Sequence, residues 1–140
     1  MFLPQTAEYA LRAMAQIAVS PTDEPIRTQD LAEKTHVPLQ YLLKIMRRLV
    51  VEGLLVSEKG RSGGFRLARP LKRIRFVDIL KAVGFESEPN HCAFGWGECN
   101  PKKPCVLHSS YKALNAGFKQ WAEKTTLADV ASGQARLTWP

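Results

Sequence analysis

The sequence predicts a mainly α-helical fold with a small β-hairpin wing: a winged helix-turn-helix followed by a long C-terminal helix. Three observations support this fold class. Apolar residues recur at helical spacing in successive segments of the first 52 residues. Two short apolar strands then flank a glycine-rich turn. Further along, an amphipathic segment follows a loop rich in Gly and Pro. This order of elements is typical of a winged helix-turn-helix with an appended helix.

The first half of the chain predicts three helices. Apolar residues between Gln5 and Val19 share one helical face, which predicts the first helix. After a loop of turn-forming residues over 20–25, a short second helix begins at Arg27 or Thr28, with Thr28 as its N-cap. Residues 35–37 form a turn, and Pro38 takes the first position of a third helix that ends near residue 52.

The hairpin and the remaining helices follow. Strands are predicted over 54–58 and 65–69, with a turn at 59–64 between them, and a short helix over 76–83. A last short helix begins at Thr126, with Asp129 in capping-box position, and the tail over 134–140 carries no signal. Between them lies a heptad seam, which we interpret as a dimerisation helix, although a helix packed on its own core has the same spacing. The seam consists of Leu107, Tyr111, Leu114, Phe118 and Trp121.

Charge and composition divide the chain into three parts. Residues 1–85, the expected DNA-binding domain, carry 14 Lys/Arg and 8 Asp/Glu, so they hold +6 of the net charge of +7. Residues 86–106 form a cysteine-containing loop, and residues 107–140 form the dimerisation helix and tail. No apolar run approaches the roughly 18 residues of a membrane span. No secretory signal is recognised. We therefore expect a cytoplasmic protein whose thiols stay reduced.

The basic residues are arranged as a double-stranded DNA-binding surface would need them. Between Lys59 and Arg75 the chain has seven basic residues and no acidic one. Arginines of a wing can bind phosphate or enter a narrow minor groove, while the third helix can lie in the major groove. A solvated basic face is the alternative. The candidate DNA-binding residues are Thr28, Gln29, Gln40, Tyr41, Lys44, Arg61, Ser62, Gly63, Gly64 and Arg66.

The second candidate site is the loop from His91 to His108, which holds all three cysteines of the chain. Six residues separate Cys92 from Cys99 and five separate Cys99 from Cys105, wider gaps than zinc ribbons use. Three thiolates suit an iron–sulfur cluster with one further ligand. His108 stands three residues after Cys105, and His91 or a carboxylate from elsewhere is also chemically suitable. Zinc or unligated thiols are the alternatives.

The sequence resembles the Rrf2 family of bacterial winged-helix regulators, whose members include IscR-, NsrR- and RirA-like proteins. Four segments carry the resemblance over most of the chain. They are the opening at 6–13, the Tyr41-Leu42 pair, the wing at 60–67 and the three-cysteine loop. Two departures are visible. The first cysteine gap is one residue longer than in IscR, and Leu43 and Lys44 replace polar residues that IscR-like members use for base contacts.

The resemblance implies a homodimer on a pseudo-palindromic operator. It also implies an iron–sulfur cluster on Cys92, Cys99 and Cys105, for which we favour [2Fe–2S] over [4Fe–4S]. In IscR-like members the fourth ligand corresponds to His108, and in NsrR-like members to Glu8 of the partner subunit. We rank His108 first, Glu8 second and His91 third.

We therefore predict a dimeric transcription regulator that senses iron–sulfur status, nitric oxide or redox stress. A regulator whose loop binds zinc or acts as a thiol switch is the alternative. An enzyme using Cys105 and His108 as a nucleophile pair has little support, because the sequence offers no orienting acid and no oxyanion device.

Overall fold

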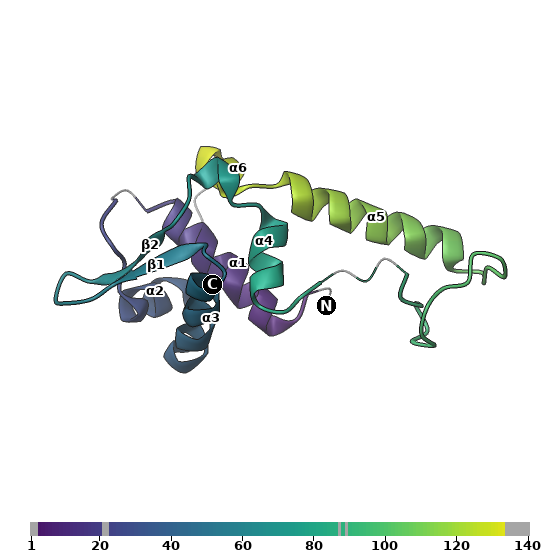
Figure 1. Ribbon diagram of the computed structural model, residues 1–140, viewed down its shortest axis with the longest axis horizontal. Coiled ribbons are helices and arrows are strands. Elements are labelled where there is room, and N and C mark those ends of the chain that lie inside the picture. The colour runs from purple at the N-terminus through teal and green to yellow at the C-terminus, as the bar shows by residue number, and fades with distance from the viewer. Residues whose placement is uncertain (1–2, 21–22, 87, 89, 134–140) are drawn as a thin grey trace.

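The computed structural model describes residues 3–20, 23–86, 88 and 90–133. The tail over 134–140 and residues 21–22 of the first predicted loop lie outside this part. The elements are α1 (Gln5–Ala18), α2 (Thr28–Thr35), α3 (Leu39–Val51), β1 (Leu55–Glu58), β2 (Gly64–Leu67), the 3-10 turn η1 (Leu71–Arg73), α4 (Phe76–Ala82), α5 (His108–Lys124) and α6 (Leu127–Ser132). The predicted fold class is confirmed: the chain is mostly helical and carries an antiparallel hairpin wing, as Figure 1 shows.

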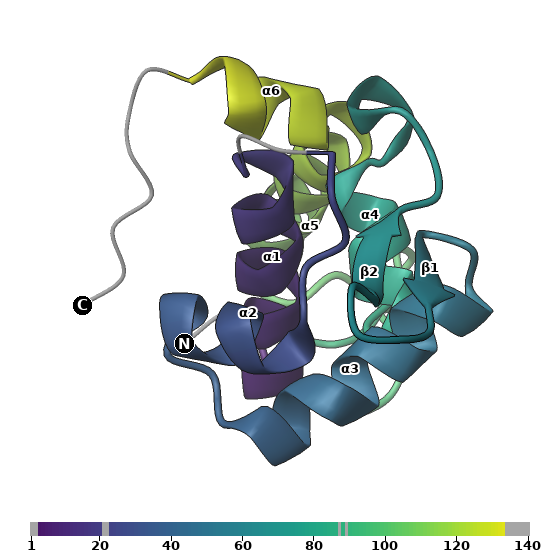
Figure 2. The ribbon, with the colours of Figure 1, turned by 90° about the vertical axis from the view of Figure 1, so that its left-hand side faces the viewer.

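The core of the winged helix forms around α1. Figure 2 shows α1 in the middle of the body, and it packs against α2, α3, α4 and α6. Its buried face consists mainly of small residues, which let neighbouring helices come close. The facing stripe of α3 is larger, and burying each such side chain contributes about 1.5–3 kcal/mol. That stripe consists of Leu42, Ile45, Met46 and Leu49.

α2 begins at Thr28, one of its two predicted starts, whereas its N-cap and the start of α3 differ from prediction. Arg27, not Thr28, is the N-cap of α2, because the chain stays extended at Ile26 to pair with the wing. Likewise Pro38 is the N-cap of α3, with an extended ψ of 132°, so α3 starts one residue later than predicted. Between them His36 adopts a left-handed conformation with φ 56°, which ends α2 and turns the chain towards α3.

The wing gains a third extended segment that the sequence did not reveal. β1 pairs with β2 in antiparallel register, with Leu55 opposite Leu67. On the other side of β2, the N–H of Ile26 donates to the carbonyl of Phe65 at 2.9 Å, and the N–H of Phe65 donates back at 2.8 Å. The strands are shifted by a residue or two from the predicted bounds, and the predicted second strand ends earlier because η1 begins after Pro70.

The chain leaves this body after α4 and returns to it at α6. Two backbone bonds make the return: the N–H of Phe76 donates to Thr125 at 2.9 Å, and the N–H of Leu127 donates to Ile74 at 3.0 Å. Leu127 is fully buried in the main core. α6 has the predicted capping box, in which the N–H of Thr126 donates to the Asp129 carboxylate at 2.8 Å. Figure 1 shows α5 extending away from the body, with the cysteine loop at its far end.

The heptad seam of α5 is divided between two environments. Phe118 lies edge-to-face against Phe85, with ring centroids 5.8 Å apart, and Trp121 lies against Phe76 at 5.3 Å. Leu107 and Leu114 stay 38% and 49% exposed. One part of the seam therefore packs on the chain's own body, and the other part is open. Within the described residues, no helix has the length and apolar character to cross a lipid bilayer.

Candidate functional site

The cysteine loop, residues 90–107, connects the linker after α4 to α5 and lies at the end of the molecule remote from the wing (Figure 1). Its first part folds back on itself through an antiparallel bridge between His91 and Glu98. The N–H of Cys92 donates to Gly97 at 2.8 Å, and the N–H of Cys99 donates to Asn90 at 2.6 Å. These bonds bring Cys92 and Cys99 together at the base of one turn.

The surroundings of these two cysteines shift the pKa values of their thiols in opposite directions. Hydrogen bonds from the backbone N–H groups of Trp96 and Phe94 lower the pKa of the Cys92 thiol. The Phe94 nitrogen lies 3.4 Å from that sulfur. Burial, followed by the negative charges of Cys92 and Cys105, raises the pKa of the Cys99 thiol. The Cys99 thiol instead donates towards the His91 carbonyl at 3.9 Å. The Cys99 sulfur therefore lies within electrostatic reach of the other two sulfurs.

The donor set fits an iron–sulfur cluster in its chemistry, because three free thiols on one loop are what such a cluster prefers. Cys92 and Cys99 are half-buried and Cys105 is exposed. In the described part of the chain, no three ligating side chains converge on a common point. Binding would therefore draw the exposed Cys105 segment towards the other two thiols.

The three candidates for a fourth ligand differ in position. His108 is the first residue of α5, and together with Cys99 it lines a small pocket of about 80 Å³. The Nδ1 of His91 lies 3.1 Å from the carboxylate of Glu88, with which it pairs. Glu8 belongs to α1 in the winged-helix body, which Figure 1 shows well apart from the cysteine loop. Of the three candidates, the single chain brings His108 into a pocket shared with a cysteine.

The candidate DNA-binding residues of α3 lie on an exposed part of the helix. Gln40, Tyr41 and Lys44 are all exposed near the start of the helix. Tyr41 also contacts Tyr9 of α1, with ring centroids 6.3 Å apart, so its ring is held against the body. At the start of α2, Thr28 is half-buried and Gln29 is exposed.

The tip of the wing depends on close backbone contacts at two glycines. A Cβ added at Gly63 would lie 2.2 Å from the carbonyl oxygen of Glu58, and one at Gly64 would lie 2.3 Å from that of Ile26. These glycines therefore shape the tip, while the neighbouring Arg61 and Ser62 are exposed on it. The guanidinium of Arg27, a residue not among the sequence candidates, donates to the Arg61 carbonyl and fastens the tip to the start of α2.

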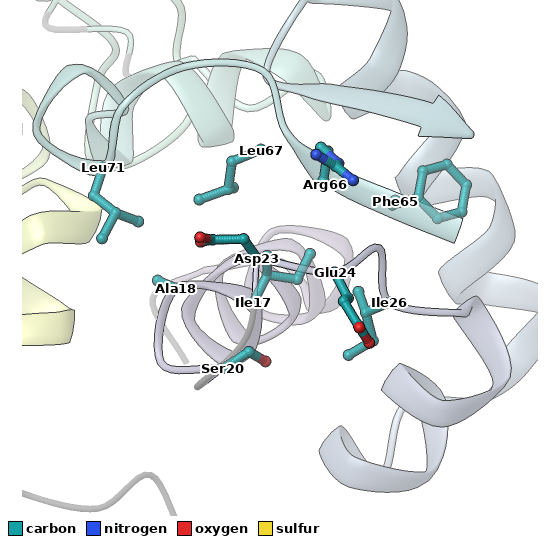
Figure 3. Close-up of a pocket in the computed structure, with 10 residues that line it drawn as sticks. All are labelled: Ile17, Ala18, Ser20, Asp23, Glu24, Ile26, Phe65, Arg66, Leu67 and Leu71. Atoms are coloured by element: carbon teal, nitrogen blue, oxygen red, sulfur yellow. The ribbon is translucent and has the colours of Figure 1, made fainter. Parts of the chain in front are cut away.

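Arg66, the remaining wing candidate, is already paired. Its Nε lies 2.9 Å from the Glu58 carboxylate on the neighbouring strand. Figure 3 shows Arg66 on β2 at one side of an open pocket of about 490 Å³, which lies between the end of α1 and the wing. Apolar side chains such as Phe65, Leu67 and Leu71 form much of its wall. Binding of Arg66 to phosphate would use the N–H groups of its guanidinium that Glu58 leaves free, or would displace Glu58.

Comparison with known proteins gives consistent matches. The Rrf2 family model, described as an iron-dependent transcriptional regulator, matches residues 3–133. An HTH-type transcriptional regulator of Mycobacterium tuberculosis (strain ATCC 25618 / H37Rv) is 36% identical over 134 residues, which cover 95% of this chain and 83% of that protein. IscR of Cronobacter sakazakii is 26% identical over 137 residues, covering 98% and 84%.

The fold is also that of a solved regulator. The structure of CymR, the global cysteine regulator of B. subtilis, matches with a TM-score of 0.79 and 21% identity, covering 94% of this chain and 97% of that one. These similar proteins are transcription regulators and not enzymes, so the nucleophile role of Cys105 and His108 is set aside. With a family match over almost its whole length, the chain belongs to the Rrf2 family of winged-helix, DNA-binding transcription regulators.

Proposed function

We propose that the protein is a homodimer that binds a pseudo-palindromic operator and senses iron–sulfur status, nitric oxide or redox stress through a cluster. The observation that carries the proposal is the placement of three thiols on the one loop that joins the winged helix to α5. Cys92, Cys99 and Cys105 would hold the cluster, for which [2Fe–2S] is favoured. The bound cluster would react with oxidants and nitric oxide, and its occupancy would follow the supply of iron.

The contacts to DNA follow from the exposed residues of α3 and the wing. With α3 in the major groove, Gln40 would bind adenine and Lys44 guanine. Tyr41, Thr28 and Gln29 would contact the sugar–phosphate backbone. From the wing, the side chains of Arg61, Ser62 and Arg66 would bind phosphate or enter the minor groove. Gly63 and Gly64 would act by shaping the wing tip, since the N–H of Gly63 is already bonded to the Gly60 carbonyl at 3.0 Å.

The test of the cluster is a visible spectrum with iron and sulfide analysis on protein purified without oxygen. We expect a coloured protein with charge-transfer bands, and we expect Cys92→Ala to lose them because one of three thiolate ligands is gone. Ser109→Ala, an exposed change on α5 beside the loop, is the matched control and should keep the bands. Colourless protein with stoichiometric zinc would refute the cluster.

The fourth ligand is tested separately, and we propose His108. We expect His108→Ala to shift the visible bands and to shorten the lifetime of the cluster in air, because His108 shares a pocket with Cys99. Glu8→Gln should leave both unchanged. The reverse result would assign the ligand to Glu8 of the partner subunit.

A zinc site or thiol switch in the same loop is the second candidate function. It is favoured by the hydrogen bonds that lower the pKa of the Cys92 thiol, since a thiolate is the reactive and metal-binding form. In that case DNA binding would respond to thiol oxidation in protein that contains no iron.

A further inference from the structure

The turn between Cys92 and Cys99 has an unusual backbone. Gly95 and Gly97 have φ values of 75° and 87°, whereas the residues between and before them, Trp96 and Phe94, are not among the positive-φ residues. Alternation of the two hands turns successive N–H groups towards the same side, which makes a concave site for an anion. Here the N–H of Phe94 donates to the sulfur of Cys92, with nitrogen and sulfur 3.4 Å apart, and the N–H of Trp96 contributes to the lowered pKa of that thiol.

The aromatic side chains of this turn take no part in these hydrogen bonds. The rings of Phe94 and Trp96 stack on each other, with centroids 5.2 Å apart, and Trp96 is 82% exposed. A second bond, from the N–H of Gly95 to the Cys92 carbonyl at 2.9 Å, closes the turn around the cysteine. The Cys99 sulfur has no such cradle and faces a carbonyl oxygen instead.

We propose that residues 94–97 form a backbone nest that holds the Cys92 sulfur and thereby sets the reduction potential of the cluster. This inference rests on the proposed function. Hydrogen bonds to a ligating sulfur stabilise the more negative, reduced cluster relative to the oxidised one. The nest supplies them from the main chain, so Gly95 and Gly97 act as positioning residues although they touch neither metal nor DNA.

The two glycines allow a selective test. A Cβ at either position would meet no atom within 4 Å, so substitution changes the backbone conformation without a clash. Gly95→Ala should disfavour the positive φ and open the nest, whereas Gly95→Asn should largely keep it, because Asn tolerates the left-handed region. Gly84→Ala is the matched control. Its φ is 82° and its added Cβ would meet only the Arg48 side chain at 3.6 Å, outside the cysteine loop.

Two measurements decide the proposal. In reduced, cluster-free protein, amide hydrogen exchange at Phe94 and Trp96 should be slow for an exposed loop and should speed up at least tenfold in Gly95→Ala. In cluster-loaded protein at a fixed potential, Gly95→Ala should shift the ratio of reduced to oxidised cluster about tenfold towards oxidised, or about 59 mV for one electron. Gly95→Asn and Gly84→Ala should stay close to the parent in both.

The outcomes separate this inference from the proposed function. Unprotected amides in the parent, or an unchanged potential in a well-loaded Gly95→Ala protein, would overturn the nest while leaving the cluster in place. If the parent binds no iron, the cluster proposal fails and the claim about the reduction potential fails with it, whereas the nest around the Cys92 sulfur is still decided by the exchange of the Phe94 and Trp96 amides.

Discussion

Arg75 and Asp78 form a compact polar contact at the start of α4. The N–H of Arg75 donates to the Asp78 carboxylate at 3.0 Å, and its guanidinium donates to the other oxygen at 3.1 Å. Burial of the carboxylate opposes its ionisation. The hydrogen bonds and positive charge of Arg75 outweigh that effect, so the pKa of Asp78 is lowered. This capping contact lies beside the bridge between Arg75 and Thr126, where α6 joins the body.

Asp78→Asn is expected to destabilise the fold by about 1 kcal/mol near neutral pH, the usual cost of a weakened helix cap. Because the pKa of Asp78 is lower in the folded state, its contribution is present above the unfolded value of about 3.9 and is lost as pH falls through the folded value. Urea unfolding at pH 7 and at pH 3–4 checks this. A gap between parent and variant that stays constant into acid would contradict it.

The candidate site shows which residue-level features a sequence can predict. The cysteines and His108 are visible in the sequence, because they lie close together along one segment of the chain. The pairing of Arg66 with Glu58 is not, because seven residues lie between them and only the strand register brings them together. The contact of Arg27 with the wing tip depends on Ile26 joining the hairpin. The nest at Phe94 is invisible too, since it consists of backbone groups.

Most helices and the hairpin were predictable as elements, and their ends were not. α1, α3 and α4 follow from apolar periodicity, because each buries one continuous stripe. α2 begins at Thr28, one of its two predicted starts, but its N-cap is Arg27. α3 begins one residue later than predicted, since Pro38 is held extended. The third segment of the wing was missed because a single paired residue, Ile26, makes it. A single bridged residue produces no alternation of apolar and polar residues in the sequence.

At the scale of the wing, Gly64→Ala is expected to detach this third segment. The new Cβ would lie 2.3 Å from the Ile26 carbonyl oxygen, and that backbone cannot yield without losing its bonds to Phe65. We expect a loss of about 1–3 kcal/mol in unfolding free energy, the usual cost of overpacking, and weaker DNA binding.

Gly60→Ala is the matched control for this change. An added Cβ at Gly60 would meet nothing within 4 Å, so only the backbone conformation costs energy. Thermal melts and hydrogen exchange at the Ile26 and Phe65 amides compare the two variants. Equal destabilisation, with exchange unchanged at both amides, would show that the Ile26 contact does not matter.

At the scale of the whole molecule, the C-terminal part of α5 packs on the body and its N-terminal part is exposed. Ala122 is buried with the main core, while Leu114, about two turns earlier, remains 49% exposed. The division could not be read from the heptad spacing, because that spacing is the same for a helix packed on its own chain and for one packed on a second copy. An exposed stripe of this kind supports the proposed homodimer.

Leu114→Glu is expected to convert the dimer to a monomer, because a charge in an apolar helix interface is left without a partner. Affinity for a two-half-site operator should fall at least tenfold, since only one recognition helix would then bind. Ala116→Glu adds the same charge on the opposite, exposed side of α5 and should have little effect. Sedimentation and DNA titration check both variants, and a stable Leu114→Glu dimer would place the interface elsewhere.

Two backbone hydrogen bonds fix the C-terminal end of α5 to the winged-helix body. Thr125 and Leu127 pin one end to the start of α4, while the cysteine loop is attached to the other. Phe118 and Trp121 also contact Phe85 and Phe76, so the part of α5 that stands free of the body runs over residues 108–117 and is about 15 Å long. A tilt of about 5° of this free part would move the loop by about 1 Å. In the reverse direction, a displacement of the loop would reach the winged helix as a small rotation of α5.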